Sequence, residues 1–154
     1  MEKTILERIK CYWEQRSDDF SRQSFAEMQN EKYDLWSNEL KQIIGGRTAL
    51  KILDVGTGSG YMALLLASSG HNVTGIDLCD NMIASAIDLR NKLKLDADFF
   101  VSDAQQLPFD DNSFDLLITR NLTWTLPNLE NAYHEWYRVL TVSYTHLTLP
   151  TIRL

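Results

Sequence analysis

The stretch that decides the fold is Leu53-Asp54-Val55-Gly56-Thr57-Gly58-Ser59-Gly60, an apolar segment that runs into a turn with three glycines. The apolar residues before this turn, from Leu50 to Val55, are typical of a buried strand, and residues 61–69 after it are typical of a helix. Glycine lets the backbone approach a ligand closely, and the start of a helix offers unpaired N–H groups. The stretch therefore predicts a ligand-binding turn between a strand and a helix.

The spacing of the glycines separates two classes of ligand. A dinucleotide-binding turn of the form Gly-x-Gly-x-x-Gly would need glycine or alanine at position 61, which is Tyr61. Here the third glycine comes one residue earlier, and Asp54 lies two residues before Gly56. A carboxylate at that place would repel a pyrophosphate and suits a cationic ligand. The turn thus favours a cationic ligand, with an NAD-dependent oxidoreductase as the alternative.

The rest of the chain predicts an α/β fold. Residues 4–16 and about 20–44 have the three- and four-residue apolar spacing of helices, and Gly45-Gly46 ends this helical region. Further strands are expected at 72–77, 97–102 and 114–119, with helices at 81–95, which Asp80 would cap, and 128–140. This alternation predicts a Rossmann-like, doubly wound, mainly parallel sheet with helices on both faces.

Two more carboxylates follow predicted strands. Asp77 ends the second strand, where a carboxylate can accept both hydroxyls of a ribose; capping of the next helix is the alternative, although Asp80 suits that role better. Asp103 ends the third strand and can accept a hydrogen bond from an adenine amino group, or it can form an Asx-turn. Because the carboxyl ends of adjacent parallel strands face one crevice, we expect Asp54, Asp77 and Asp103 to meet there.

Composition excludes several classes of protein. The chain has 154 residues, of which 44% are hydrophobic and 23% charged, and its net charge is −6. So acidic a chain is a poor partner for nucleic acid, and no apolar run approaches the roughly 20 residues of a membrane span. Cys11 and Cys79 lack metal-ligand spacing, which predicts reduced core thiols, no metal site and a cytoplasmic location. His71 and His134 are expected to be solvated.

Together these residues resemble the class I S-adenosylmethionine-dependent methyltransferases, and among them the small-molecule methyltransferase type 11 group. The resemblance runs from about Leu50 to Leu140, and beyond the glycine turn it rests on Gly75-Ile76-Asp77, Ser102-Asp103-Ala104-x-x-Leu107-Pro108-Phe109, Phe114 to Asn121, and Tyr137-Arg138-Val139-Leu140. It implies S-adenosylmethionine as the cofactor and transfer of a methyl group to a small-molecule acceptor by in-line displacement. A non-catalytic nucleotide-binding module of the same fold is a further alternative.

The resemblance also implies roles for single residues. Asp54 would orient the ammonium group of the cofactor through water, Asp77 would hold the ribose, and Asp103 with Ala104 would contact the adenine edge. Met82 would pack on the adenine, or equally well in the core. The other implied cofactor-binding residues are Gly56, Thr57, Gly58, Gly60, Leu78 and Asn121. No catalytic base is assigned, because a sulfonium methyl group is already activated and needs positioning above all.

The aromatic residues and the C-terminal stretch complete the expectations. Tyr12, Trp13 and Trp124 are candidates for an aromatic lid over the acceptor, with simple packing as the alternative. Residues 1–46 are expected to form a helical cap segment and 47–140 an incomplete methyltransferase domain. Residues 142–151 resemble a translated sequencing adapter, and residues 141–154 are expected to be a non-native tail. The last strands of the family's sheet would then be missing, and the fourth strand would have a bare edge.

Overall fold

A four-stranded parallel sheet forms the centre of the computed structural model, which describes residues 3–141. Of the predicted tail, residues 142–154 lie outside the described residues. The elements follow in the order α1 (Ile5–Glu27), α2 (Glu31–Ile44), β1 (Lys51–Val55), α3 (Tyr61–Ser68), β2 (Asn72–Asp77), α4 (Asp80–Leu93), β3 (Asp98–Val101), β4 (Leu116–Thr119), the short 3-10 helix η1 (Thr123–Thr125) and α5 (Leu129–Val139). The predicted α/β class is confirmed.

The strand order β3-β2-β1-β4 places the glycine turn at the middle of the sheet. β1 pairs with β2 on one side, with Asp54 opposite Gly75, and with β4 on the other, with Asp54 opposite Ile118. All three pairings are parallel, so the carboxyl ends of the four strands lie along one edge. The segments that follow these strands therefore meet at that edge, which is where open α/β sheets bind ligands.

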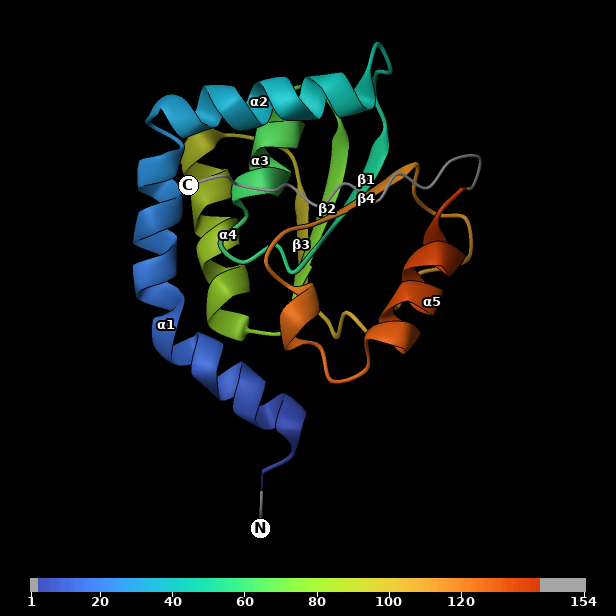
Figure 1. The fold of residues 1–154 in the computed structure, drawn as a ribbon. Helices are drawn as coiled ribbons and strands as arrows, with labels where there is room; N and C mark the ends of the chain where they lie inside the picture. The colour runs from blue at the N-terminus through green and yellow to red at the C-terminus, as the bar shows by residue number, and fades with distance from the viewer. Residues whose placement is uncertain (1–2, 142–154) are drawn as a thin grey trace.

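Both faces of the sheet are covered by helices, as predicted. Ile52 of β1 packs into one apolar cluster with α2, α3 and α4, whereas its neighbour Leu53 packs into a second cluster with Trp136 and Val139 of α5. Figure 1 shows the same division, with α1 to α4 on one side of the sheet and α5 on the other. The alternation follows from the strand geometry, because successive side chains point to opposite faces.

The first two helices meet at residues 28–30, which corrects the predicted break after residue 16. Ser17 does not end the helix, because its hydroxyl donates to the carbonyl of Glu14 at 2.9 Å and the serine lies buried inside α1. The break falls instead where the side chain of Asn30 accepts the N–H of Lys32 at 2.9 Å and caps α2. An asparagine that takes a free N–H group of the first turn is a strong start signal.

Two polar residues have different partners from those predicted. Asp80 is not the cap of α4: the cap position is Cys79, and Asp80 lies exposed in the first turn, where it pairs with Lys10 of α1. His71 is buried rather than solvated, because its Nδ1 accepts the N–H of Leu50 at 3.2 Å just before β1. His134 is exposed, as expected.

The outer strands are shorter than predicted at their ends. Ala97 falls outside β3, because its carbonyl accepts a hydrogen bond from Arg90 at 3.0 Å instead of joining the ladder. Phe114 falls outside β4 and forms an isolated parallel bridge with Leu140, while the N–H of Thr141 donates to the carbonyl of Phe114 at 2.8 Å. The edge predicted to be bare is therefore paired at Phe114, whereas among the described residues the strand β4 has β1 as its only neighbouring strand. Within residues 3–141, no helix combines the length and apolar character needed to cross a membrane.

Candidate functional site

A cavity of about 100 Å³ lies at the carboxyl edge of the sheet, beneath α1. It brings together ten of the eleven residues predicted to bind a cofactor, which are Asp54, Gly56, Thr57, Gly58, Asp77, Leu78, Met82, Asp103, Ala104 and Asn121. Their arrangement follows from the topology, because each of these segments directly follows a strand whose carboxyl end reaches this edge. The structure thus places the predicted residues around one space, while their roles toward a ligand stay a prediction.

Asp54 is the most deeply buried acid of the site. Only 2% of its surface is exposed, and its carboxylate accepts a hydrogen bond of 2.7 Å from the hydroxyl of Thr57. The pKa of Asp54 is raised from 3.8 to about 6, and burial is the largest cause. The Thr57 hydrogen bond and the positive charge of Arg120 oppose this rise, while the negative charge of Asp77 adds to it. A buried carboxylate with so little compensation suits a cation placed in the cavity.

The raised pKa of Asp54 predicts a stability cost at neutral pH. Between pH 3.8 and about 6 the folded chain keeps a proton that the unfolded chain releases, so the free energy of unfolding falls as the pH rises through this range. The Asp54→Asn variant should therefore be more stable than the wild type at pH 7.5, by about 2–3 kcal/mol, since each pKa unit corresponds to about 1.4 kcal/mol.

Denaturant unfolding of both proteins at several pH values checks this expectation. Asp88→Asn, on the exposed face of α4, is the matched control and should change neither the stability nor its pH dependence. A less stable Asp54→Asn variant at pH 7.5, with the wild-type pH slope retained, would contradict the proposed burial of the ionised carboxylate.

Asp77 connects β2 to the glycine turn. One of its carboxylate oxygens accepts the N–H of Gly58 at 2.9 Å, and the other accepts the N–H of Cys79 at 3.0 Å. Burial raises the pKa of Asp77, and hydrogen bonds from the backbone N–H groups of Cys79, Gly58 and Leu78 oppose that rise. A carboxylate has about four acceptor positions, so these hydrogen bonds do not use all of them. The side chain thus fixes the turn and can still accept hydrogen bonds from a ligand in the cavity.

Asp103 forms the Asx-turn that was the alternative to its predicted contact with adenine. Its Oδ1 accepts the N–H of Gln105 at 2.9 Å, which is an Asx-turn, and the amide of Gln105 donates to the same carboxylate. Asp103 nevertheless lines the cavity, next to Ser102 and Ala104. The Asx-turn and a contact to a ligand are compatible, because a carboxylate has about four acceptor positions.

Gly60 is the predicted residue that does not line the cavity. It caps α3 with a φ of +85°, and a Cβ atom at this position would lie 3.0 Å from the Cβ of Ala86 and 3.1 Å from the ring of Phe99. The third glycine is therefore explained by packing between α3, α4 and β3 rather than by contact with a ligand.

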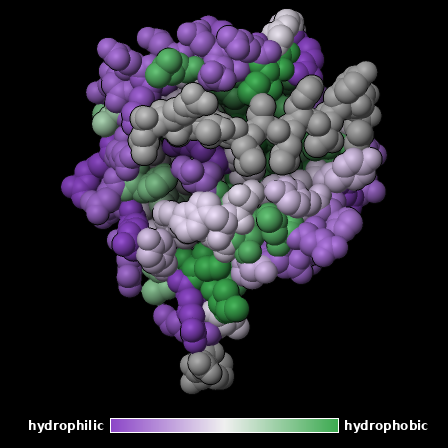
Figure 2. Space-filling view, viewed as in Figure 1, coloured by the Kyte–Doolittle hydropathy of each residue, from purple (hydrophilic) through white to green (hydrophobic). Residues whose placement is uncertain are grey.

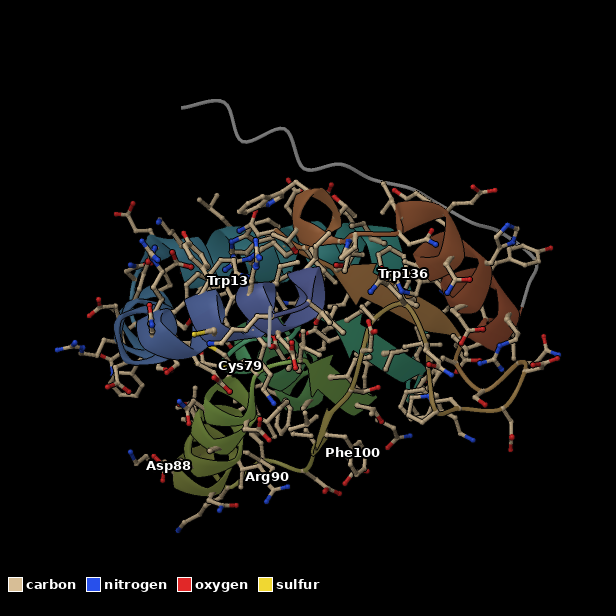
Figure 3. All side chains as sticks on the ribbon, turned by 90° about the horizontal axis from the view of Figure 1, so that it is seen from below. Trp13, Cys79, Asp88, Arg90, Phe100 and Trp136 are labelled. Carbon is tan, nitrogen blue, oxygen red and sulfur yellow. The ribbon has the colours of Figure 1, made fainter. Side chains whose placement is uncertain are left out.

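The helix α1 covers the cavity with apolar side chains, most of which were not among the predicted site residues. Leu6, Ile9 and Phe20 line it together with Trp13, whose ring packs edge-on against Phe20 at a centroid distance of 5.8 Å. Figure 3 shows Trp13 on α1, well separated from Trp136 on α5, and Figure 2 shows apolar surface beside the lower end of the molecule, where α1 begins. The apolar spacing along residues 5–20 indicates a buried helix face. It does not show that this face covers a ligand site, because a helix that packs on the core has the same pattern.

Only one of the three aromatic residues predicted to form a lid lines the cavity. Trp13 lines the cavity, whereas Tyr12 and Trp124 do not and are 46% and 71% exposed. Trp124, in η1, packs at an angle against Trp13 with a centroid distance of 6.4 Å. One of the three aromatic residues thus faces the cavity, and the other two pack against its ring from outside.

Arg120 and Tyr61 also line the cavity and were not among the predicted site residues. Tyr61 begins α3, and Arg120 directly follows β4. The guanidinium carbon of Arg120 lies 5.3 Å from the centroid of the Tyr61 ring. Their sequence signal is weak, because a single arginine after a strand and a tyrosine at the start of a helix are common.

Comparison with known proteins identifies related chains. Residues 53–143 match the family described as a methyltransferase domain, of the type 11 group. The chain is similar to the ubiquinone/menaquinone biosynthesis C-methyltransferase of Rickettsia typhi, with 38% identity over 69% of this chain and 46% of that protein. It is also similar to the demethylmenaquinone methyltransferase of Lactococcus lactis, with 28% identity over 97% of this chain and 64% of that protein.

The fold of the chain is also similar to that of a solved methyltransferase structure. The phosphoethanolamine N-methyltransferase 2 of Haemonchus contortus, in a complex with S-adenosylhomocysteine, superposes with a TM-score of 0.64 and 32% identity, over 70% of this chain and 26% of that one. The chain spans between 24% and 64% of the length of the first curated relatives that it matches. The similarity therefore covers the sheet and the glycine turn, and only part of each relative.

Proposed function

This chain belongs to the type 11 family of S-adenosylmethionine-dependent methyltransferases, and from this membership we propose that it transfers a methyl group to a small-molecule acceptor. The observation that carries the proposal is the gathering of three strand-end carboxylates and the glycine turn around one cavity. The family match also favours S-adenosylmethionine over NAD as the ligand of the turn, in agreement with the acid at position 54.

The residues of the cavity fit the groups of S-adenosylmethionine. Asp54 is buried without a basic hydrogen-bond partner and offers a negative charge to the ammonium and sulfonium groups. The free lone pairs of Asp77 can accept the ribose hydroxyls, and Asp103 with Ala104 can contact the adenine. When bound, the cofactor supplies an electrophilic methyl group on a sulfonium, and its sulfur leaves as a neutral thioether.

The residues of this chain would then act by binding and alignment. The glycine turn and Asp77 hold the cofactor from the sheet, and the apolar side chains of α1 exclude water on the other side. Placing the acceptor atom in line with the methyl group, at contact distance, provides much of the acceleration. We assign no catalytic base, since the proton of the acceptor, where it has one, can leave to water after transfer.

The size of the cavity suggests that α1 moves during binding. Pockets that bind small-molecule ligands usually have volumes of roughly 300–1,000 Å³, whereas the volume of this cavity is about 100 Å³. The ion pair between Lys10 of α1 and Asp80 of α4 is exposed at the surface, so separating it costs little. We therefore infer that α1 opens to admit the ligands and closes over them.

The acceptor proposed for this site has an apolar body. Four side chains of α1 that line the cavity are apolar, which are Leu6, Ile9, Trp13 and Phe20. Relatives named for methylation of sterols and of quinone precursors are consistent with such an acceptor, although those names describe the relatives alone. We also propose a cytoplasmic location, because Cys11 and Cys79 are both free thiols.

Radiolabelled methyl transfer from S-adenosylmethionine to a panel of apolar small molecules tests the function. With an acceptor found, Trp13→Ala should raise the KM for that acceptor by about tenfold or more, because burying a large aromatic side chain contributes roughly 1.5–3 kcal/mol. The affinity for S-adenosylhomocysteine should change less than about threefold, since the proposed cofactor contacts come from the sheet edge.

Phe25→Ala is the matched control, because it removes an aromatic ring of α1 that is 45% exposed and does not line the cavity. Tyr12 does not serve this purpose, because its ring packs edge-on against Trp13 at a centroid distance of 5.3 Å. Phe25→Ala should leave both constants close to the wild type. An equal rise of KM in both variants would argue against α1 as the acceptor wall, and binding of the cofactor without transfer to any tested acceptor would favour the non-catalytic alternative.

A further inference from the structure

The hydroxyl of Tyr61 is a buried polar group with no hydrogen-bond partner among residues 3–141. Tyr61 is 2% exposed, it lines the cavity, and its nearest charged neighbours are Glu27 and Arg120. A buried hydroxyl without a partner is costly, and native proteins retain few of them. A ligand oxygen in the cavity would satisfy this group.

Arg120 presents further unused donors beside this hydroxyl. Within the described part of the chain, its nearest carboxylate is that of Glu27, whose oxygen lies 3.7 Å from the guanidinium nitrogen, beyond hydrogen-bond distance. The guanidinium also lies over the ring of Trp36, at 5.3 Å from its centroid, and its side chain is 21% exposed. Stacking holds the planar group in place and leaves its N–H groups free for an oxygen acceptor.

The order of the strands places these donors at one end of the site. Along the carboxyl edge, Asp103 follows β3, Asp77 ends β2, Asp54 lies in β1, and Arg120 follows β4. Adjacent strands are about 4.8 Å apart, so the edge carries acids over three strands and then a base on the fourth. Such an order matches a ligand with a nucleoside at one end and both charges of an amino acid at the other.

We propose that Arg120 and the hydroxyl of Tyr61 bind the carboxylate of the amino-acid part of the cofactor, while Asp54 faces the adjacent ammonium group. The proposal rests on the proposed function. Arg120 lowers the pKa of Asp54, whereas Asp77 raises it. The effect of Arg120 agrees with this placement, because it shows that the guanidinium lies close to the carboxylate of Asp54. An anionic oxygen of the acceptor is the other possible source of the same chemistry.

Two ligands that differ only in the amino-acid part separate these possibilities. S-adenosylhomocysteine carries the carboxylate and ammonium groups, whereas 5′-methylthioadenosine keeps the nucleoside and the sulfur without them. Titration calorimetry of the full chain should show that Arg120→Met weakens binding of S-adenosylhomocysteine by about 30-fold or more, as expected for charge-assisted hydrogen bonds. Binding of 5′-methylthioadenosine should change by less than about threefold, because that ligand makes no such contact.

Further variants keep the test decisive. Tyr61→Phe should weaken S-adenosylhomocysteine alone by about fivefold to tenfold, which corresponds to one hydrogen bond. Arg120→Lys keeps the charge and should retain part of the affinity. It replaces Arg120→Met in the test if Arg120→Met does not fold. Arg22→Met is the matched control, because Arg22 lies exposed on α1 beside Asp19, and it should bind both ligands as the wild type does.

The opposing outcomes are distinct. Equally weakened binding of both ligands would show a structural role for Arg120 and would overturn the inference. Unchanged binding of both ligands would overturn it as well: a raised KM for the acceptor would then assign the donors to the acceptor, and an unchanged KM would show no role for Arg120. Failure of the wild type to bind either ligand would overturn the proposed function itself.

Discussion

Replacing Asp77 with alanine should weaken binding of S-adenosylhomocysteine by at least about 100-fold. The substitution removes the carboxylate that is expected to accept two ribose hydroxyls, and hydrogen bonds to a charged group contribute about 1.5–3 kcal/mol each. It also leaves the N–H groups of Gly58 and Cys79 without their acceptor, so the glycine turn loses its anchor to β2. Titration calorimetry measures the affinity, and thermal unfolding shows whether the variant remains folded.

Two matched variants separate the causes. Asp77→Asn keeps the shape and one acceptor oxygen, so its affinity should lie between those of the wild type and Asp77→Ala. Asp88→Ala, on the outer face of α4 in Figure 3, removes an exposed acid that pairs with Lys92 and should change nothing. A folded Asp77→Ala variant with wild-type affinity would remove Asp77 from the binding site.

Gly60→Ala should lower the free energy of unfolding by about 2–5 kcal/mol. A positive φ costs a residue with a side chain about 1–2 kcal/mol, and overpacking of a filled core costs about 1–3 kcal/mol more. Both costs apply here, because φ is +85° and the new methyl group would lie 3.0 Å from Ala86 and 3.1 Å from Phe99. Denaturant unfolding provides the measurement.

Gly70→Ala is a control for the backbone cost alone. Gly70 has a φ of +88°, and a Cβ atom there would have no neighbour within 4 Å. Its loss should be about 1–2 kcal/mol, the cost of the positive φ without overpacking. Equal losses in the two variants would mean that Gly60 has no packing role. A Gly60→Ala protein that stays folded should still bind S-adenosylhomocysteine, because Gly60 does not line the cavity.

Much of the fold could be predicted from the sequence because local signals and topology agree. The glycine turn after an apolar strand, together with the alternation of strands and helices, predicts a parallel sheet, and the sheet then brings Asp54, Asp77 and Asp103 to one edge. One argument for the ribose role of Asp77 does not hold, since Asp80 does not cap α4. The position of Asp77 does not depend on that argument, because it follows from the end of β2.

The parts that could not be predicted depend on tertiary contacts. Ser17 resembles a helix end in sequence, but its hydroxyl bonds to its own helix and α1 continues over the cavity. His71 resembles a surface residue beside Gly70, but it accepts a backbone N–H from the segment before β1. Arg120 belongs to the site only because β4 lies beside β1, a neighbour relation that no local pattern records.

The most direct test of the site is titration of the intact chain with S-adenosylhomocysteine and, separately, with NAD. We expect one equivalent of S-adenosylhomocysteine to bind with measurable heat, loss of that heat in Asp77→Ala, and no heat with NAD. Binding of NAD in place of S-adenosylhomocysteine, or no binding of either ligand by the folded chain, would contradict the assignment of the carboxyl edge to S-adenosylmethionine.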